Sequence, residues 1–251
     1  MEPTDYIFGL RAVIEAIREG KPIDKLYIKK DLGGELASEL FALMREHHIV
    51  GLRVPVERLN RITRRNHQGV VAILAAVTYH NLGHLVSGLY DEGVLPFVVV
   101  LDGITDVRNF GAIARTAECC GVNAIVVPER GSVSVGGDAV KTSAGALLTL
   151  PVCRERSLVS AVRYLKDSGF KVVAVSEKAQ INYTLGDYTG PTALVMGAED
   201  VGISAPVLEL CDTHVSIPMF GHIGSLNVSV AAGVMMYEVV RQRLNADLEV
   251  M

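Results

Sequence analysis

Five short apolar runs recur between residues 95 and 251, and stretches with helical periodicity separate them. Strands that are buried on both faces of a parallel sheet read as continuous apolar runs of this kind. Strands that alternate with helices predict an open, mostly parallel sheet with helices on both faces. The runs are PFVVVLDG (96–103), NAIVVP (123–128), FKVVAVS (170–176), TALVMG (192–197) and THVSIP (213–218).

The intervening segments have the apolar spacing of helices. The last of them, NVSVAAGVMMYEVVRQR, is apolar on nearly all sides, and Arg241 and Arg243 close it with charges that suit the carboxyl end of a helix. The predicted helices are 111–121, 143–150, 158–169 and 227–243.

Residues 1–78 form a separate pattern, which predicts a small α/β domain of its own. Residues 79–94 read as a connector with a short helix, and residues 95–251 as the second, larger domain. Within the first domain, the periodicity predicts helices at 10–18 and 35–48 and strands at 25–30, 49–55 and 69–77.

Charge differs between the two parts. Residues 1–80 hold 12 Lys and Arg against 10 Asp and Glu, a net charge of +2, and the remainder carries −6, which together give the −4 of the chain. One basic cluster stands out, with Arg58, Arg61, Arg64, Arg65 and His67 within ten residues. The cluster has two interpretations, a solvated helix face followed by a turn or a contact to RNA phosphates.

Composition excludes several classes of protein. No apolar run approaches the roughly 18 residues of a membrane span, and the amino-terminal segment lacks the apolar stretch of a secretory signal. The four cysteines show no CxxC spacing and read as reduced thiols. We therefore expect a cytoplasmic protein without a membrane or metal partner. The chain also lacks the GxGxxG, P-loop, HExxH and GxSxG motifs.

Three polar, glycine-containing loops directly follow predicted strands, at 101–117, 195–204 and 217–233. Ligands of open α/β sheets bind beyond the carboxyl ends of the strands, where these loops would lie. Glycine allows a ligand to approach the backbone, and free amides at helix starts can hold it.

Asn109 is either the N-cap of a helix that begins near Gly111 or a polar group of the site. Arg115 lies four residues after Gly111, so its guanidinium would extend back over that residue toward the Asn109 loop. An arginine among apolar residues needs an anion or a carbonyl oxygen as its partner. Glu199, in the second loop, is the internal candidate, as a site group or as half of a buried ion pair.

Ser225 and Asn227 stand just before the final apolar helix, where capping is the simplest role for an asparagine. Five polar side chains from three separate loops nevertheless converge in the manner of a functional site.

These loops resemble the three motifs of the SpoU family of RNA 2′-O-methyltransferases, in the SPOUT superfamily. The first motif, N-x-G-a-I-x-R-T-A, is met from Asn109 to Ala117, and the second, G-[SA]-E-x-x-G-[IL], from Gly197 to Ile203. The third, I-P-M…G-S-L-N-V-S-V-A, is met from Ile217 to Ala231. KTSAGAL (141–147) and the first-domain segments FGLRAVIEAI and HQGVVA are also similar, so the resemblance covers essentially the whole chain.

The resemblance implies transfer of a methyl group from S-adenosylmethionine to a ribose 2′-hydroxyl. It places the cofactor against Gly197, Ile217 and Leu226 and surrounds the ribose with the catalytic set, Asn109, Arg115, Glu199, Ser225 and Asn227. The family's arginine acts as general base or, because a guanidinium is a poor proton acceptor, as a phosphate clamp held by the glutamate. Asp200 departs from the family, in which many members have glycine at this position.

The resemblance further implies a trefoil knot and a homodimer. The small first domain with its basic cluster favours ribosomal RNA as the partner, and the predicted contacts are Arg58, Arg61, Arg64 and Arg65. The best-known similar members methylate a guanosine in 23S ribosomal RNA. The alternatives are an adenosine-specific ribosomal-RNA or a transfer-RNA enzyme, and a noncatalytic RNA-binding or ribosome-assembly factor. A nicotinamide-dependent enzyme would need the glycine fingerprint that this chain lacks.

Overall fold

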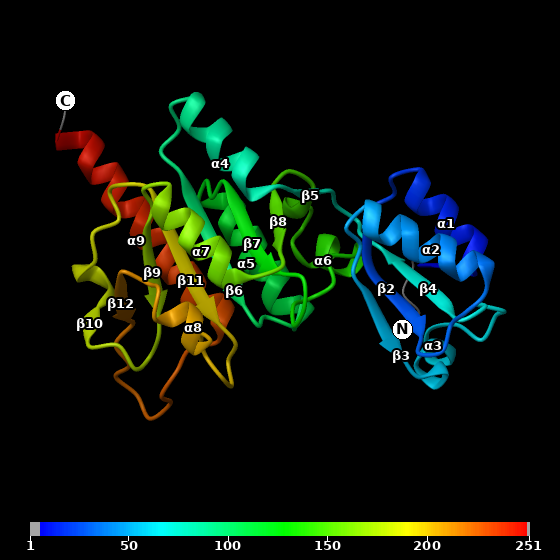
Figure 1. The fold of residues 1–251 in the computed structure, drawn as a ribbon. Helices are drawn as coiled ribbons and strands as arrows, with labels where there is room; N and C mark the ends of the chain where they lie inside the picture. Colours follow the sequence, from blue (N-terminus) through cyan, green and yellow to red (C-terminus); the bar gives the residue numbers. More distant parts are fainter. Residues whose placement is uncertain (1–5, 250–251) are drawn as a thin grey trace. The chain divides into compact units, whose positions relative to one another are not determined.

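A computed structural model describes residues 6–249, and the few positions outside this range fall at the ends of the two predicted domains. Contacts divide the chain into two compact units (Figure 1). The first comprises Met1–Thr78 with Ser134–Asp138, and the second comprises Tyr79–Val133 with Ala139–Met251. No helix in the described part of the chain has the length and apolar character that a membrane crossing requires.

The first unit is a four-stranded mixed sheet with three helices. The sheet order is β1-β4-β2-β3, in which β4 runs antiparallel to both of its neighbours and β2 runs parallel to β3. In chain order its elements are β1 (Tyr6–Phe8), α1 (Leu10–Arg18), β2 (Ile23–Lys29), α2 (Glu35–Glu46), β3 (Gly51–Val54), α3 (Val56–Ile62) and β4 (Val70–Leu74).

Helix α1 forms where the apolar spacing predicts it. Val13, Ile14 and Ile17 are almost fully buried, because positions three and four residues apart lie on one helix face. That face packs with α2 against one side of the sheet, where Leu26 and Val70 belong to the same core. The short helix α3 packs against the opposite side.

The second unit contains an eight-stranded sheet in which every pair of strands is parallel, with the order β10-β12-β9-β11-β6-β7-β8-β5. This confirms the predicted α/β class. Its elements are β5 (Tyr79–His80), α4 (Leu82–Asp91), β6 (Phe97–Asp102), α5 (Val107–Cys119), β7 (Ala124–Pro128), η1 (Ala146–Leu148), β8 (Val152–Glu155), α7 (Leu158–Asp167), β9 (Lys171–Val175), β10 (Ile181–Asn182), η2 (Tyr183–Leu185), β11 (Thr192–Gly197), α8 (Ala205–Leu208), β12 (Thr213–Ser216) and α9 (Val228–Glu249). The short helix α6 (Gly137–Thr142) includes residues of both units.

The central strands are apolar on both faces because helices cover both faces. Along β6, Val98 and Val100 pack in one core with residues of α4 and α7, and Val99 and Leu101 are equally buried. Successive side chains of a strand alternate between the two faces, so the latter pair faces the side of α5 and α9. Helix α9 packs on α5 and on β11.

The strand order reverses direction at the centre of the sheet. From β6 the chain proceeds to β7 and β8 on one side, whereas β9, β11 and β12 lie on the other, with β11 beside β6. In such sheets the carboxyl ends of the strands that flank the reversal point border the ligand site. The trefoil knot remains a prediction.

Some of the predicted helices differ from the observed ones. Helix α9 continues to Glu249, well beyond the predicted end at residue 243. Arg241 therefore does not close the helix, and it pairs with Glu238 at 2.7 Å. Arg243 instead donates to the backbone oxygens of Leu95, Pro96 and Gly190.

The segment 143–150 forms only one 3-10 turn, η1, because Ala144 and Gly145 both have positive φ angles, which stop a right-handed helix. Residues 79–94, predicted to connect two domains, form β5 and α4 within the second unit.

Candidate active site

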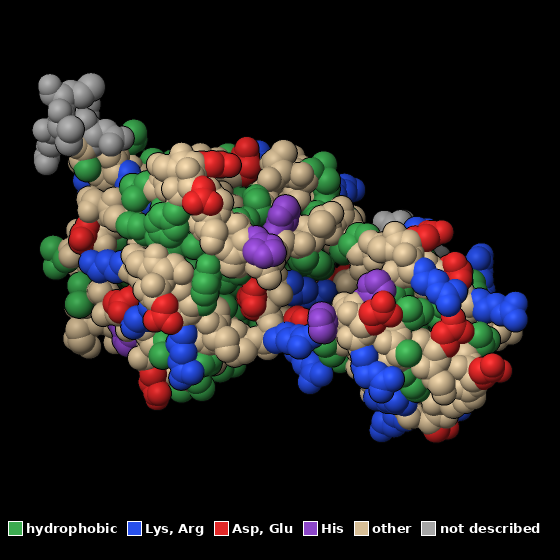
Figure 2. Space-filling view, turned by 45° about the horizontal axis from the view of Figure 1, so that its top comes forward, with side chains coloured by type: hydrophobic (Ala, Val, Ile, Leu, Met, Phe, Trp, Pro, Cys, Tyr) green, Lys and Arg blue, Asp and Glu red, His purple; other side chains and the backbone are tan. Residues whose placement is uncertain are grey.

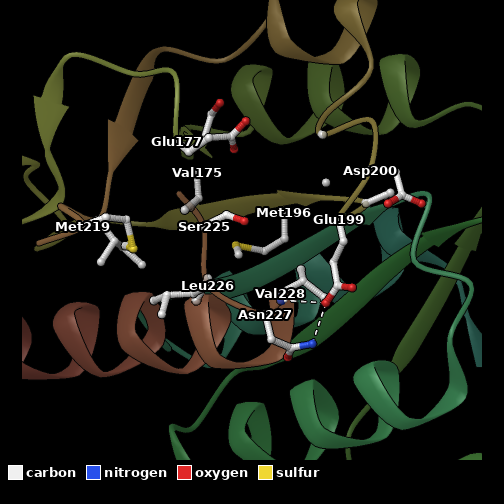
Figure 3. A pocket seen from close by; sticks show the side chains of 16 residues that line it. Val175, Glu177, Met196, Glu199, Asp200, Met219, Ser225, Leu226, Asn227 and Val228 are labelled. Atoms are coloured by element: carbon white, nitrogen blue, oxygen red, sulfur yellow. Dashed lines mark hydrogen bonds between the residues drawn. The ribbon is translucent and has the colours of Figure 1, made fainter. Parts of the chain in front are cut away.

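A cavity of about 410 Å³ opens at the carboxyl ends of β9, β11 and β12, beside the first turn of α9 (Figure 3). The volume is in the range of small-molecule sites. Its lining residues are Val175, Ser176, Glu177, Met196, Gly197, Ala198, Glu199, Asp200, Gly202, Ile217, Met219, Ser225, Leu226, Asn227, Val228 and Ala231. Six of the residues predicted for the site, Gly197, Glu199, Ile217, Ser225, Leu226 and Asn227, are therefore brought to one cavity.

A tight loop after β11 forms one wall of this cavity. Ala198 pairs with Gly202 in an isolated bridge, and the Gly202 amide donates to the Ala198 oxygen at 2.8 Å. Gly202 has φ +75°, which favours glycine. A Cβ added at Gly197 would overlap the backbone of Gly202 and Ile203. Gly197 is thus required by the closeness of the loop to itself, rather than by the approach of a ligand.

Glu199 is the centre of a hydrogen-bond network between the β11 loop and two helices. Its Oε1 accepts from Asn109 Nδ2 at 3.2 Å, Asn227 Nδ2 at 2.5 Å and the Val228 amide at 3.2 Å. Figure 3 shows the side chain directed toward Asn227, at the start of α9. No residue in the described range 6–249 donates to Oε2, so one carboxylate oxygen remains available to a ligand.

Asn227 caps α9 and belongs to the same network. Its Oδ1 accepts from the Ser229 amide at 3.0 Å, which satisfies one of the free donors at a helix start. Its Nδ2 donates to Glu199 and to Asn109 Oδ1, the latter at 3.0 Å. The two interpretations of this residue, capping and site formation, are therefore both realised in one side chain.

Asn109 does not cap a helix. Helix α5 begins at Val107 rather than near Gly111, and Asp106 is its N-cap, with Oδ1 accepting from the amides of Arg108 and Asn109. Asn109 lies in the first turn, and both its amide oxygen and its amide nitrogen are used by the network. Its side chain thus links the first and third loops through Glu199.

Arg115 is exposed and forms no hydrogen bond or ion pair with another residue of the described range. The expected Arg115–Glu199 pairing is not formed. At 100° per residue, Arg115 lies roughly 120° around α5 from Asn109, and the glutamate is already held by two amide groups. The predicted pairing of Arg115 with Glu199 assumed that the first loop extends to Gly111 before the helix begins. Gly111 is instead buried against Thr142, whose Cβ a side chain at 111 would strike.

The remaining pocket residues come from the third loop and from the second. Ser225 and Leu226 precede the α9 cap, and Leu226 is 37% exposed. Ile217 follows β12 and is half-buried. Asp200 lies on the rim, and its carboxylate lies away from Asn227 in Figure 3.

Sequence reasoning missed two contributions to this site. Asp102, at the end of β6, accepts from the Ser204 amide at 2.8 Å and from Ser204 Oγ at 2.6 Å. This pair fastens the β11 loop to the neighbouring strand. Val175, at the end of β9, and Glu177, just after it, complete the wall opposite α9. The signal for Asp102 was its position directly after a buried strand.

The four arginines predicted to bind RNA lie in the first unit, on α3 and the loop that follows it, and all are exposed. Arg58 lies over the ring of Tyr27, at 5.4 Å from its centroid, and Arg65 over Phe8 at 6.0 Å. Blue Lys and Arg side chains are numerous on the visible face of this unit in Figure 2. His67 is buried, so it does not belong to the exposed cluster.

The second unit is an all-parallel α/β sheet with a cavity at the carboxyl ends of its strands, and its companion unit exposes four arginines. This combination is typical of enzymes that act on nucleic acid. The second unit matches the SpoU rRNA Methylase family over residues 96–237, which is more than half of the chain. Residues 6–80 match the RNA 2′-O ribose methyltransferase substrate-binding family. This chain belongs to the SpoU family of RNA methyltransferases.

Similar proteins extend over nearly the whole chain. A TrmH-family tRNA/rRNA methyltransferase of Staphylococcus saprophyticus is 36% identical over 237 residues, which is 94% of this chain and 95% of that protein. A relative of the same name from Staphylococcus aureus strain MSSA476 is 36% identical over 243 residues, 97% and 98% of the two chains.

Solved structures show the same fold. The SpoU methyltransferase AviRb from Streptomyces viridochromogenes, in complex with AdoMet, has a TM-score of 0.60 and 28% identity and covers 96% of this chain and 90% of its own. An AdoMet-bound rRNA methyltransferase from Sinorhizobium meliloti has a TM-score of 0.57 and 26% identity, with coverage of 94% and 87%. The predicted family and enzyme class are confirmed.

Proposed function

We propose that this protein transfers a methyl group from S-adenosylmethionine to a ribose 2′-hydroxyl of RNA, with a guanosine of 23S ribosomal RNA as the target. The observation that carries this proposal is the Glu199 network, because it places an available carboxylate oxygen at the edge of a cavity of small-molecule size. The choice of a ribosomal guanosine rests on the resemblance to two-domain members that modify ribosomal RNA.

The cavity suits S-adenosylmethionine in both size and chemistry. Apolar side chains of Val175, Met196, Ile217 and Leu226 offer a surface for the adenosine, and backbone groups of the Gly197 loop offer polar contacts. Three carboxylates, of Glu177, Glu199 and Asp200, line the cavity and complement a cationic ligand. When bound, the cofactor supplies a methyl group activated by a sulfonium.

The residues of the network then have distinct roles. Asn109 and Asn227 hold Oε1 of Glu199, so the carboxylate is fixed before substrate binds. Its free Oε2 accepts the hydrogen bond of the 2′-hydroxyl, orients that oxygen toward the methyl group and takes the proton that the oxygen loses on methylation. Ser225, which lines the same cavity just before α9, contributes a hydroxyl to the same ribose. Arg115 clamps a phosphate next to the target, because a guanidinium is a poor proton acceptor.

The first unit supplies RNA affinity through Arg58, Arg61, Arg64 and Arg65. All four guanidinium groups are exposed, and none forms an ion pair with a carboxylate in the described range. They are therefore available to phosphates, and each phosphate contact releases bound counterions. We further propose that residues 1–78 act as the RNA-binding domain and 95–251 as the catalytic domain.

A homodimer and a cytoplasmic location complete the proposal. Val230, Tyr237 and Leu244 of α9 are each more than half exposed. Their seven-residue spacing puts these three apolar side chains on one helix face, which a second copy would cover.

The test incubates the protein with labelled S-adenosylmethionine and unmodified ribosomal RNA, then maps the modified nucleotide. Methyl transfer to one 2′-hydroxyl of 23S ribosomal RNA is the expected result. Transfer to transfer RNA alone would favour the second candidate, which the tRNA/rRNA name of the similar proteins supports. RNA binding without any transfer would instead indicate a noncatalytic factor.

A further inference from the structure

A second cavity lies wholly within the first unit, far along the chain from the motif loops. It measures about 500 Å³ and opens between the segment that follows β2 and the segment that joins α3 to β4. Its volume is in the range of small-molecule sites. The lining residues are Lys29, Asp31, Leu32, Gly33, Val56, Arg65, Asn66, His67, Gln68 and Gly69.

The α3–β4 wall of this cavity is held in a fixed conformation. The buried ring of His67 accepts from the Gly69 amide through Nδ1 and donates through Nε2 to Asn60 Oδ1, both at 3.0 Å. These partners correspond to a neutral imidazole. Gln68 has φ +51°, and its Oε1 accepts from the Leu10 amide at the start of α1. A non-glycine residue in this conformation persists only where its surroundings hold it.

The charged groups of the cavity favour an anion. Lys29 pairs with Asp31 at 3.1 Å, and the hydrogen bond from this lysine lowers the pKa of the Asp31 carboxyl. With two cations, one carboxylate and a neutral histidine, the lining has a net charge of +1. Arg65 has no carboxylate partner in the described range, and its guanidinium lies over the Phe8 ring.

Two amide side chains supply hydrogen-bonding groups that the fold leaves unused. Asn66 is exposed, and its side chain forms no hydrogen bond with any residue between 6 and 249. Gln68 uses its Oε1 for the Leu10 amide, while its Nε2 has no acceptor within the same range. An amide offers donors and acceptors in one plane, which suits the edge of a base.

We propose that this cavity binds one unpaired nucleotide of the RNA substrate, with its phosphate at Arg65 and Lys29 and the edge of its base at Asn66 and Gln68. The proposal rests on the proposed function, because it requires RNA as the substrate. A fixed wall, a single net positive charge and two free amides distinguish this cavity from a surface that only attracts the RNA backbone. Recognition of unpaired bases is the usual route to sequence specificity in RNA.

The experiment compares Arg65→Gln with Arg64→Gln in the full-length protein. Both arginines are exposed neighbours in the basic cluster, but only Arg65 lines the cavity. Affinity for a 23S ribosomal-RNA fragment is measured by fluorescence anisotropy at several salt concentrations. We expect Arg65→Gln to weaken binding about tenfold and Arg64→Gln about twofold, with each salt slope reduced by about 1. Equal losses in the two variants would overturn the proposal.

Asn66→Ala tests the reading of the base. The variant removes no charge, so its salt slope should match that of the unaltered protein, whereas selection from a randomised single-stranded RNA pool should lose its preference at one position. An unchanged sequence preference would contradict base recognition. Circular dichroism checks that each variant is folded, and Asn66→Gln, which retains the amide, serves as the conservative control.

A further experiment distinguishes binding of an RNA nucleotide in the cavity from binding of a free nucleotide. Guanosine and adenosine 5′-monophosphates are titrated against the protein and the Arg65→Gln variant. Arg65-dependent binding of a monophosphate at micromolar concentration, with RNA binding unaffected by the substitution, would assign the cavity to a free nucleotide and overturn the proposal. If the unaltered protein transfers no methyl group and binds no RNA, the proposed function itself fails. If methyl transfer is normal but Arg65→Gln and Arg64→Gln weaken RNA binding equally, only this inference is overturned.

Discussion

The two units of this protein are both built from helices and a β-sheet, but they differ in sheet type and in charge. The first has a mixed sheet of four strands and a net charge of +2 over residues 1–80, and its cations are exposed on α3 and the adjoining loop. The second has an all-parallel sheet of eight strands, and the residues from 81 onward carry −6. A polyanion is attracted at long range to the first and repelled by the second.

The two units group their polar side chains in different ways. The second unit gathers loops from β9, β11 and β12 at one sheet edge, where side chains distant in sequence meet at Glu199. The first unit presents its arginines along one short stretch of chain, so little long-range folding is needed to group them. Substitutions in the two units should therefore change different measurable quantities.

The largest effect is expected for Glu199→Gln. Glutamine keeps an oxygen for Asn227 and the Val228 amide but removes the charge that accepts the ribose hydroxyl. We expect methyl transfer to fall about 100-fold or more, with unchanged RNA affinity. Single-turnover transfer with labelled cofactor measures this. Glu209→Gln, at the exposed end of α8 and outside the cavity, is the matched control, and equal losses in both variants would remove Glu199 from its proposed role.

Arg115→Ala should follow, with about a 100-fold loss of transfer at saturating RNA. Because the side chain is exposed and unpaired in the described range, the melting temperature should stay the same. Cofactor affinity, measured by calorimetry, should also be retained. Near-normal turnover would show that the second unit works without this cation and would shift phosphate binding entirely to the first unit.

The quadruple substitution of Arg58, Arg61, Arg64 and Arg65 by Gln addresses the first unit. RNA affinity should fall by about 30-fold at physiological salt, and the salt slope should become shallower by about 3, since up to four phosphate contacts are lost. Cofactor affinity should not change. An unaltered salt slope would mean that the cluster is a solvated surface and that the second unit selects the RNA.

The smallest effect concerns stability of the second unit alone. Asp212 accepts from the Val172 amide at 2.9 Å and pairs with Lys166 at 2.8 Å. Burial raises the pKa of this carboxyl, but the hydrogen bonds from Lys166 and Val172 outweigh burial, so the pKa is lowered. The carboxylate is about a third exposed, and solvent screens the pair. Asp212→Asn should cost about 1 kcal/mol of unfolding free energy at pH 7.

The sign of the pH dependence follows from the direction of the shift. A lowered pKa stabilises the folded state above the unfolded value of about 3.9, and the contribution is lost as the pH falls through the folded pKa. The difference between Asp212→Asn and the unaltered protein should therefore shrink as the pH falls below about 3.9 and vanish below the lowered pKa of the folded state. Hydrogen exchange resolved by peptide should show the change only in the second unit. A difference that does not change with pH would assign it to packing.

Much of the fold was predictable because apolar periodicity has a local cause. Strand β6 and helix α1 form where the pattern places them, since a buried strand must be apolar throughout and an amphipathic helix must repeat near 3.6 residues. The helix predictions that failed did so where backbone conformation or capping overrides the apolar periodicity. Positive φ angles at Ala144 and Gly145 ended one predicted helix, and the cap by Asp106 moved the start of α5 four residues back from Gly111.

The sequence by itself determined the class of sheet, the family, and the set of loops that carry polar side chains. These follow from residue types at fixed spacings. The tertiary structure decided which of those side chains meet. It joined Asn109, Glu199 and Asn227 and left Arg115 exposed, because the rotation of α5 and the closure of the β11 loop depend on packing between distant segments. It also revealed the second cavity, whose walls lie more than thirty residues apart along the chain.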